Sequence, residues 1–524
     1  MAKVDKLIVT NFAALRAKYR AVGLASIRGA VGQLIAADAR RGLVTRLLDL
    51  DSRAAMKALR APRVRAAGNA RQNKEAIDAV YRALVPDYLM ILGSVDVVPH
   101  QPLLNPLFTD DPDDDDDRYA YSDLPYACDA PYSRRIEDFR GPTRVVGRLP
   151  DITGAREPSY LARLLATATS YRTRSRDAYD AYFGLSVKWW HGSTELSLRT
   201  LMGSADRLKL SPPSGPGWTP AEMRPRVHFI NCHGALADPA FFGQPREDSD
   251  DYPEAELSSR VDRRITSGTV AAAECCYGAE LYDPARAKGQ RGICYAYLGG
   301  GAYGYFGSST TSYGPSKGNG WADLVCRYFL EGVLRGASLG RAVLEARQSF
   351  VLGASVLQAE DLKTLAQFNL LGDPSIHSVS RVRQAIETSR VFKRALPNAD
   401  SLPPGRELRR DRLLRTGVLL DETVGAVRRA PALRPTATVR KALADAARDS
   451  GIRSDRLRIA SFAVHDPAAK RLYRSAGLRR DTPNAVHTAI GARPSGRDGI
   501  KRIVVVSATV ERGRIVRLRR LHSH

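Results

Sequence analysis

The sequence predicts an α/β protein with a doubly wound, mainly parallel sheet that is flanked by helices. An N-terminal helical segment and a small C-terminal α+β domain are expected beside it. Two short apolar runs carry this prediction: residues 226–234 are RVHFINCHG, and residues 269–278 are TVAAAECCYG. A continuous apolar run bounded by turn residues is typical of a strand that is buried on both faces, as in a parallel sheet.

The first two regions of the chain differ in their periodicity. Residues 1–80 carry apolar side chains at helical spacing, which predicts a helical N-terminal segment. Residues 81–380 mix short apolar runs with helical patterns, which predicts the main α/β unit. Within that unit we expect strands at 88–93, 143–150 and 185–190 and helices at 158–179, 321–334 and 339–350.

The last third of the chain has a different sequence pattern. Residues 381–435 contain two proline-rich breaks and are interpreted as a linker. Residues 436–524 are interpreted as a basic α+β domain. It should hold a helix at 439–449, a strand at 458–464 and a hairpin formed by 500–508 and 513–521.

Composition indicates an ordinary globular protein, with 44% hydrophobic and 26% charged residues among 524. No apolar stretch reaches the length of about 18 residues that a membrane span needs, and the first residues lack the apolar core of a secretion signal. Six cysteines in a chain of this length do not indicate a disulfide scaffold. We therefore expect a cytoplasmic protein without membrane association.

The formal net charge of +24 is concentrated in the last third. Residues 381–524 hold 33 Lys and Arg against 13 Asp and Glu, so the rest of the chain is close to balance. A basic surface of this kind suits nucleic acid or another anionic partner. We treat nucleic-acid binding as the weaker alternative; a steep loss of affinity with salt would be its mark.

Reactive side chains stand at the ends of both apolar runs. His233 is followed by Gly234, and Cys275 and Cys276 are followed by Gly278. Ligands bind beyond the carboxyl ends of the strands in open α/β sheets, so these side chains should meet there. A neighbouring imidazole favours the thiolate, which is the nucleophilic form of cysteine. The alternative is that the cysteines are ordinary buried thiols and His233 is a structural histidine. Two strand-end motifs in this order favour a nucleophilic site instead.

The His-Gly motif and the Cys-x-x-Gly motif resemble the catalytic motifs of caspase-like cysteine peptidases. Within that group the chain most resembles the gingipain family. The resemblance covers about residues 80–380, and matching stretches are residues 86–93 (PDYLMILG), 122–126 (SDLPY), 147–150 (GRLP) and 370–375 (LLGDPS). It implies a cysteine endopeptidase in which His233 is the general base and backbone near Gly234 stabilises the oxyanion. Gingipains are secreted, so the expected cytoplasmic location departs from that family.

The resemblance leaves two candidates for the nucleophile. Gingipain-like families have Cys-x-x-Gly, which selects Cys275, whereas caspases proper have Cys-x-Gly, which selects Cys276. The wider match favours Cys275. Adjacent residues of a strand face opposite ways, so only one of the two thiols can face the histidine.

The resemblance also suggests which residues bind substrate. In gingipains an acidic residue ahead of the Gly-Arg-Leu/Phe strand helps to form the primary specificity pocket, and Asp123 and Asp129 both lie in the matching region. A carboxylate there would favour cleavage after basic residues. Cys276 and Ser308 are further candidates for substrate contact.

No cofactor or catalytic metal is required by this chemistry. The loop at residues 110–117 is Asp at every position except Pro112, so calcium is a candidate ligand of the loop. The expected partners are a protein or peptide substrate and a regulatory protein that restrains the peptidase. The alternative function is a catalytically degenerate scaffold or binding module whose basic C-terminal domain is the contact surface.

Overall fold

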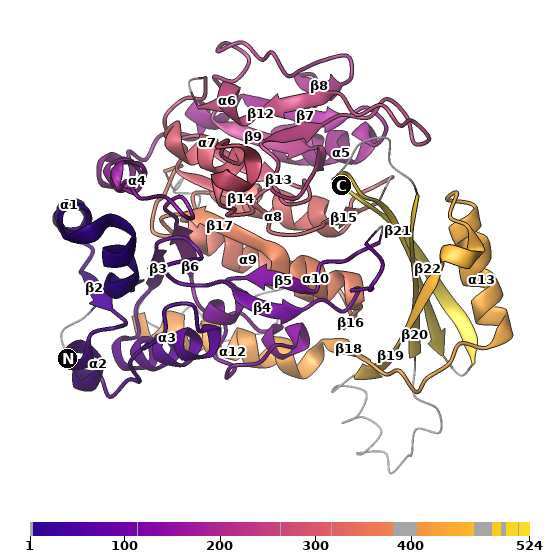
Figure 1. Ribbon diagram of the computed structural model, residues 1–524, viewed down its shortest axis with the longest axis horizontal. Coiled ribbons are helices and arrows are strands. Elements are labelled where there is room, and N and C mark those ends of the chain that lie inside the picture. Colours follow the sequence, from indigo (N-terminus) through magenta and orange to yellow (C-terminus); the bar gives the residue numbers. More distant parts are fainter. Residues whose placement is uncertain are drawn as a thin grey trace.

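The computed structural model describes residues 4–380 except 113, 263 and 316, residues 406–465, residues 485–493, and residues 499–524 except 512, with the side chains of 406–414 and 454 left out. In this part the predicted fold class is confirmed, because a ten-stranded, mainly parallel sheet forms the centre of an α/β structure (Figure 1). Its strands are β1 (Lys6–Thr10), β2 (Thr45–Asp49), β3 (Tyr88–Leu92), β6 (Val146–Leu149), β7 (Tyr182–Val187), β8 (Leu208–Ser211), β9 (Val227–Asn231), β13 (Val270–Ala273), β14 (Gly304–Ser308) and β17 (Phe368–Gly372).

Two parallel halves make up this sheet, in the order β2-β1-β3-β6-β17 and β14-β13-β9-β7-β8. They meet where β14 and β17 pair antiparallel, from Gly304 opposite Gly372 to Ser308 opposite Phe368. Because β7, β9, β13 and β14 are parallel to one another, their carboxyl ends lie at one edge of the sheet. That edge is where the predicted site should be found.

Helices cover both faces of the sheet (Figure 1). One layer contains α1 (Phe12–Arg40), α4 (Ser159–Ser170), α6 (Ser258–Val261) and α7 (Ile293–Gly299). The other contains α5 (His191–Met202), α8 (Trp321–Leu334), α9 (Leu339–Leu352) and α10 (Ala359–Gln367). The predicted helices at 321–334 and 339–350 are therefore confirmed as α8 and α9, and the predicted helix at 158–179 is shorter, ending at Ser170.

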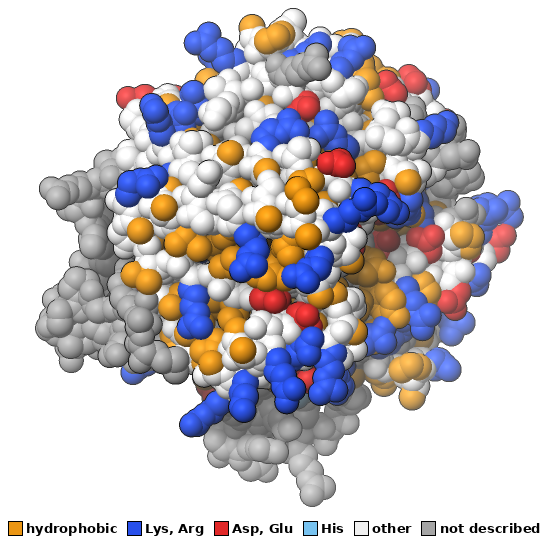
Figure 2. All heavy atoms as spheres, turned by 60° about the vertical axis from the view of Figure 1, so that its left-hand side comes forward, with side chains coloured by type: hydrophobic (Ala, Val, Ile, Leu, Met, Phe, Trp, Pro, Cys, Tyr) orange, Lys and Arg blue, Asp and Glu red, His pale blue; other side chains and the backbone are white. Residues whose placement is uncertain are grey.

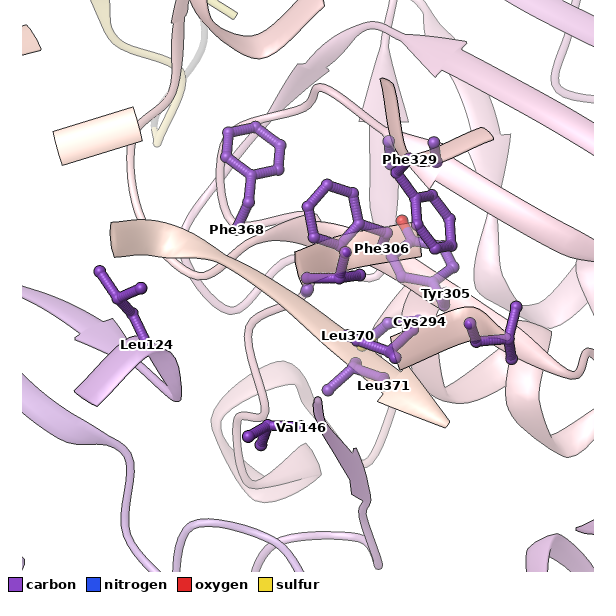
Figure 3. Close-up of a cluster of buried hydrophobic side chains, with 14 of the residues drawn as sticks. Leu124, Val146, Cys294, Tyr305, Phe306, Phe329, Phe368, Leu370 and Leu371 are labelled. Atoms are coloured by element: carbon purple, nitrogen blue, oxygen red, sulfur yellow. The ribbon is translucent and has the colours of Figure 1, made fainter. Parts of the chain in front are cut away.

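Aromatic packing fills the core where the two halves of the sheet meet (Figure 3). The ring centroid of Phe306 in β14 lies 4.8 Å from that of Phe329 in α8 and 5.6 Å from that of Phe368 in β17. All three side chains are buried. Large buried rings of this kind contribute much of the apolar area that holds a sheet and its helices together.

The N-terminal segment is not purely helical, which corrects the prediction for residues 1–80. It contains α1, α2 (Arg53–Ala58) and most of α3 (Ala70–Leu84), but β1 and β2 join the central sheet beside β3. The fully buried strand KLIVT is only five residues long, so its apolar run is too short to stand out among alanine-rich helices. Lys6 of this strand is buried and pairs with Asp38 and Asp373, which ties the segment to the rest of the fold.

A second, seven-stranded sheet has the order β15-β22-β21-β20-β19-β18-β16 and packs against α13 (Ala437–Arg448) (Figure 1). Its strands are β15 (Tyr313–Gly314), β16 (Val356–Leu357), β18 (Gly425–Arg429), β19 (Arg458–His465), β20 (Ala485–Arg493), β21 (Arg502–Glu511) and β22 (Arg514–Ser523). The expected helix, strand and hairpin of the C-terminal region are confirmed. The predicted linker is not simply a connector: residues 381–405 lie outside the described part, but α12 (Arg406–Thr423) and β18 fall within it.

This second sheet is continuous with the α/β unit, because β15 and β16 come from residues 313–357. The last strand, β22, ends beside β15 (Figure 1). The C-terminal region therefore does not hang from the main unit as a separate appendage. Its final residues lie at the edge where the strands β9, β13 and β14 end.

Two small sheets complete the fold: β4 (Gln101–Leu104) with β5 (Tyr119–Ser122), and β10 (His233–Gly234), β11 (Ala240–Phe242) and β12 (Glu254–Leu257). Among the described helices none is long and apolar enough to cross a membrane. On the face drawn in Figure 2, Lys and Arg side chains are scattered between hydrophobic and uncharged ones and exceed Asp and Glu, as the net charge predicts.

Candidate active site

The two predicted halves of the site are brought together at one edge of the sheet. His233 and Gly234 form β10, which begins two residues beyond the end of β9, and Cys275 and Cys276 begin two residues beyond the end of β13. A Cβ atom added to Gly234 would lie 1.9 Å from the carbonyl oxygen of Cys276, so only glycine allows this approach. The His-Gly half therefore lies directly against the backbone of the cysteine half.

The imidazole of His233 is held in one orientation. Its Nε2 lies 2.9 Å from Oε1 of Gln244, and the amide nitrogen of Gln244 donates to the carbonyl oxygen of Ser249 at 2.9 Å. The second bond fixes which end of the amide accepts, so we assign the proton of His233 to Nε2 and leave Nδ1 as the basic nitrogen. Nδ1 has no hydrogen-bond partner among the described residues.

Aromatic side chains and burial define the environment of this histidine. The ring of Trp190 meets it edge-on at 4.6 Å between centroids, and Tyr252 does so at 5.2 Å. Burial lowers the pKa of His233 to about 4, so the ring is neutral at physiological pH. A neutral imidazole with a free nitrogen is the form that accepts a proton.

The two adjacent cysteines lie in the turn after β13 and face different surroundings. The Sγ atom of Cys275 lies 3.4 Å from the backbone nitrogen of Cys232 and is part of the hydrophobic core. Cys276 is outside that core, and its Sγ atom accepts a hydrogen bond from the backbone N–H of Ser312 at 3.2 Å. Burial raises the pKa of Cys275 well above its ordinary value and that of Cys276 to about 11.

The last residue of the chain lies at the same place. The backbone N–H of Cys276 donates to the carbonyl oxygen of His524 at 3.0 Å, and the N–H of His524 donates to the carbonyl oxygen of Ser312 at 3.0 Å. His522 is opposite Gly314 in the antiparallel pair of β15 and β22. The sequence showed no signal for this contact, because β15 has only two residues and its partner follows about 200 positions later.

The two acids proposed for basic specificity bind arginines of this chain. Asp123 is buried and forms two bonds with Arg148, at 2.9 Å and 2.6 Å, and Arg148 holds the pKa of Asp123 below its ordinary value against the effect of burial. Asp129 pairs with Arg144 at 2.6 Å. Both carboxylates are thus already occupied, which gives them a structural explanation.

The hydroxyl residues after β14 have distinct positions. Ser308, a candidate for substrate contact, is fully buried, and its Oγ donates to the carbonyl oxygen of Thr310 at 2.7 Å. It therefore supports the turn rather than lining a surface. Ser312 is the residue of this run that reaches both Cys276 and His524.

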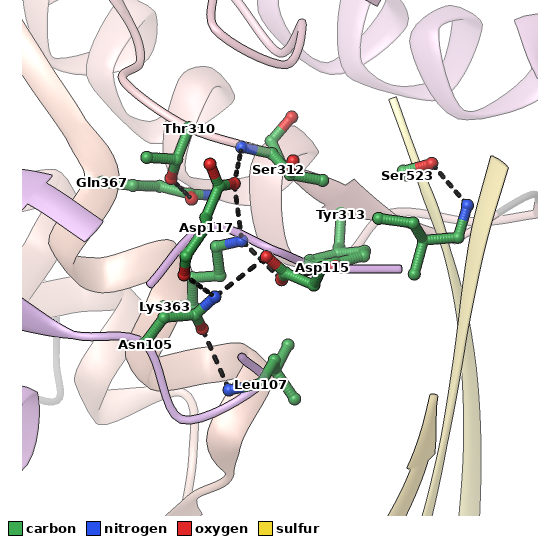
Figure 4. Close-up of polar contacts among 12 residues, drawn as sticks. Asn105, Leu107, Asp115, Asp117, Thr310, Ser312, Tyr313, Lys363, Gln367 and Ser523 are labelled. Carbon is green, nitrogen blue, oxygen red and sulfur yellow. Dashed lines mark hydrogen bonds and ion pairs between the residues drawn. The ribbon is translucent and has the colours of Figure 1, made fainter. Parts of the chain in front are cut away.

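Part of the acidic loop is buried next to the site and binds a lysine (Figure 4). Nζ of Lys363 lies 2.6 Å from Oδ2 of Asp115 and 3.4 Å from Oδ2 of Asp117. Asp117 also accepts the N–H of Thr311 at 2.8 Å and the hydroxyl of Tyr277 at 2.9 Å. Burial opposes ionisation of Asp117, but these cationic and N–H partners outweigh it and lower its pKa.

The ammonium group of Lys363 is therefore a cation that binds the loop within this chain. The sequence made calcium a candidate ligand of these aspartates, and one of them, Asp115, is fully buried against Lys363. Asp113 lies outside the described residues, and the described ones contain no cluster of three metal-binding side chains. Calcium binding by residues 110–117 stays a prediction.

Replacing Lys363 with methionine should destabilise the fold strongly, because it would leave two buried carboxylates without their cation. Breaking a buried pair in this way typically costs about 3–5 kcal/mol of unfolding free energy. Urea unfolding at neutral pH measures the change. Lys441→Met is the matched control, since Lys441 pairs with Asp445 at 2.6 Å on an exposed helix face. Equal stability of the two variants would contradict the role given to Lys363.

All six cysteines are buried and none forms a disulfide, as the composition predicted. Cys232, which lies beside His233 in sequence, packs in the core and is a structural thiol. The alternative of an ordinary buried thiol therefore describes Cys232. It also fits the environment of Cys275.

Comparison with known proteins shows that part of the chain resembles one peptidase family. The model of peptidase family C25 matches residues 263–378, which contain both candidate cysteines and the strands β13, β14 and β17 but not His233. The predicted resemblance to the gingipain family is thus confirmed over this stretch. No curated protein matches the chain.

Two solved structures resemble the whole chain at low similarity. One, described as "Structure of Protease", has 10% sequence identity and a TM-score of 0.48, and the match covers 97% of each chain. The other is from the complex of the RgpB pro- and mature domains of Porphyromonas gingivalis. Its sequence identity is 10% and its TM-score 0.45, and the match covers 98% of this chain and 99% of that one.

Proposed function

We propose that the protein is a cysteine endopeptidase in which His233 and Cys276 form the catalytic dyad. The observation that carries this proposal is the contact between the N–H of Cys276 and the carbonyl oxygen of a peptide segment, at 3.0 Å. An amide that binds a peptide carbonyl beside a thiol is the arrangement required of an oxyanion hole. Cys275 remains the alternative nucleophile, because the Cys-x-x-Gly spacing selects it.

Catalysis would proceed through an acyl-enzyme. Nδ1 of His233 takes the proton of the thiol, and the thiolate attacks the carbonyl carbon of the scissile bond. The N–H of Cys276, with backbone near Gly234, stabilises the negative oxygen of the tetrahedral intermediate. The protonated imidazole then gives its proton to the leaving amine. Water, deprotonated by the same nitrogen, hydrolyses the thioester and restores the thiol. No cofactor takes part.

The substrate is a protein or peptide. The expectation of cleavage after basic residues rested on Asp123 and Asp129, and both already bind arginines. Basic specificity through these two acids is therefore not part of the proposal. The alternative function, a degenerate scaffold with a basic contact surface, has less support because both catalytic side chains and a carbonyl-binding amide are present.

Covalent labelling tests the proposed function. A panel of thiol-directed peptidyl ketones is incubated with the full chain and with a variant that lacks residues 522–524, and adducts are counted by intact mass. One adduct on the shortened protein is expected. His233→Ala should slow its formation by about 100-fold or more, in the range typical of a lost general base. Failure of every ketone to label either form would favour the scaffold.

Gln244 is expected to act as a positioning residue for His233. Gln244→Leu removes the acceptor for Nε2–H, which frees the ring to rotate and should lower kcat/KM by about 10- to 100-fold. Gln244→Glu keeps an acceptor and adds a negative charge, which raises the pKa of His233. A base works only above its pKa, so the acidic limb of the pH–rate profile should move to higher pH. Equal loss in both variants, without that shift, would indicate a merely structural role.

A further inference from the structure

The final residues of the chain lie along β15 as a substrate would. Ser523 is opposite Tyr313 and His522 is opposite Gly314 in an antiparallel pair. His524 donates its N–H to the carbonyl oxygen of Ser312 and presents its own carbonyl oxygen to the N–H of Cys276. Strand addition of this kind fixes the register of a bound peptide through main-chain bonds and leaves alternate side chains to fill pockets. His524 thus occupies the position of the residue that precedes a cleaved bond.

The side chain of His524 fills a narrow slot. Its ring is stacked on Trp190, with 4.8 Å between centroids and 14° between planes. Gly314 lies at the Cε1–Nε2 edge of the ring, where an added Cβ would be 2.1 Å from Cε1 and 2.2 Å from Nε2. Trp190 is fixed in turn, because its Nε1 donates to Oδ1 of Asn231 at 2.9 Å. A rigid indole against one face and a glycine at the outer edge leave room for a flat ring.

A carboxyl group lies beside the ring in this slot. Oε2 of Glu274 lies 3.8 Å from Nδ1 of His524, and both side chains are almost completely buried. Burial and the adjacent Asp323 raise the pKa of Glu274 well above its ordinary value. The slot therefore has a polar group beside Nδ1 of the imidazole. The outer ring atoms, Cε1 and Nε2, lie closest to Gly314, where a longer side chain would meet the backbone of β15.

The second aromatic contact lies two residues earlier. His522 meets the ring of Trp189 edge-on at 5.2 Å between centroids, while Ser523 points the other way and accepts the N–H of Ile503 at 3.0 Å. Figure 4 shows Ser523 on that side, close to β21. The alternation of the strand therefore sends His522 and His524 toward the two tryptophans at the carboxyl end of β7.

We propose that the slot formed by Trp190, Gly314 and Glu274 is the primary specificity pocket, that it selects histidine as the residue before the cleaved bond, and that His524 occupies it in cis. This inference rests on the proposed function, because it names the substrate class of the same site. Peptides with a histidine at that position, and with main-chain N–H and carbonyl groups free to pair with β15, are the ligands it predicts. Arginine, which is longer, should be disfavoured.

Substrate preference is measured on the variant that lacks residues 522–524, after thermal melting has shown that it folds. The substrates are coumarin amides of acetyl-Leu-His-Ser-X, where X is His, Phe, Arg or Asp. We expect kcat/KM for His to exceed that for Phe several-fold and those for Arg and Asp at least tenfold. An equal or higher value for Arg would overturn the assignment of the pocket.

Gly314→Ala in the shortened protein should remove the preference for His, because the added methyl group fills the slot. Gly320→Ala is the matched control, since a Cβ there meets only Pro315 at an ordinary 3.4 Å. An unchanged His preference in Gly314→Ala would also contradict the proposal. Binding of the peptide RRLHSH is followed by tryptophan fluorescence in parallel. Binding that falls at least tenfold when the last His is replaced by Arg, without any labelling of a cysteine, would support the pocket while refuting the peptidase.

Discussion

Cys276→Ala is expected to abolish both peptide cleavage and covalent labelling, with a loss of kcat/KM of about 10⁴-fold or more, as is typical when a nucleophile is removed. The reason is geometric. The thiol of Cys276 accepts the N–H of Ser312, its own amide binds the carbonyl oxygen of His524, and its backbone lies against Gly234, the neighbour of His233. Without the sulfur, a bound peptide has no attacking group.

Cys275→Ala is the matched comparison, because the two residues are adjacent and chemically identical. The Sγ atom of Cys275 packs in the core against Cys232, so its loss should reduce stability by the removal of one small buried atom and leave labelling in place. Intact mass after treatment with a peptidyl ketone distinguishes the two. An adduct that survives in Cys276→Ala and disappears in Cys275→Ala would identify Cys275 as the nucleophile, as the Cys-x-x-Gly spacing predicts.

The candidate site illustrates what spacing can predict and what it cannot. Two strand-end motifs predicted that His233 and a cysteine would meet, and parallel strands β9 and β13 bring them to one edge. The choice between Cys275 and Cys276 depends on where β13 ends, since one residue of register reverses every side chain. Sequence patterns rarely fix a boundary to one residue, so the motif alone left the choice open.

The elements of the fold could be predicted where apolar patterns were long. The predictions failed where these patterns were short. The helices α8 and α9 have extended periodic patterns and were found within two residues. The strand β1 has five residues and needs β2 and β3 on either side to be buried, so its role is visible only in three dimensions. The burial of Asp115 could not be predicted for a different reason: Lys363, which pairs with it, lies 248 residues further along the chain.

Gln244 and the last strand show a third limit. A glutamine in a loop carries no catalytic signal, and only its bond to His233 identifies it. Likewise, residues 519–524 continue an alternating hairpin strand, and nothing in their sequence says that β22 pairs with β15. Contacts between distant segments decide both roles, whereas the sequence arguments depended on local spacing.

Deletion of residues 522–524 is expected to activate the protein. A segment tethered beside its own binding site has an effective concentration of about a millimolar, so a short peptide of modest affinity occupies the site nearly all the time, and its removal should accelerate labelling by about 10- to 100-fold. The opened site should also titrate differently. Burial raises the pKa of Cys276 to about 11 in the occupied form, so little thiolate exists at pH 8. Access of water favours the thiolate, which should move the inflection of the labelling rate to lower pH.

The full chain carrying Val516→Ala is the control, because Val516 is 55% exposed on the same strand and lies away from the site. It should label as slowly as the unaltered chain. His524→Gly tests the same idea without shortening the strand: it removes the imidazole from the slot of Trp190 and Gly314 but keeps the main-chain pairing, so its labelling rate should lie between those of the full and shortened proteins. Equal rates and equal inflections in all of these forms would mean that the terminal segment does not control access to Cys276.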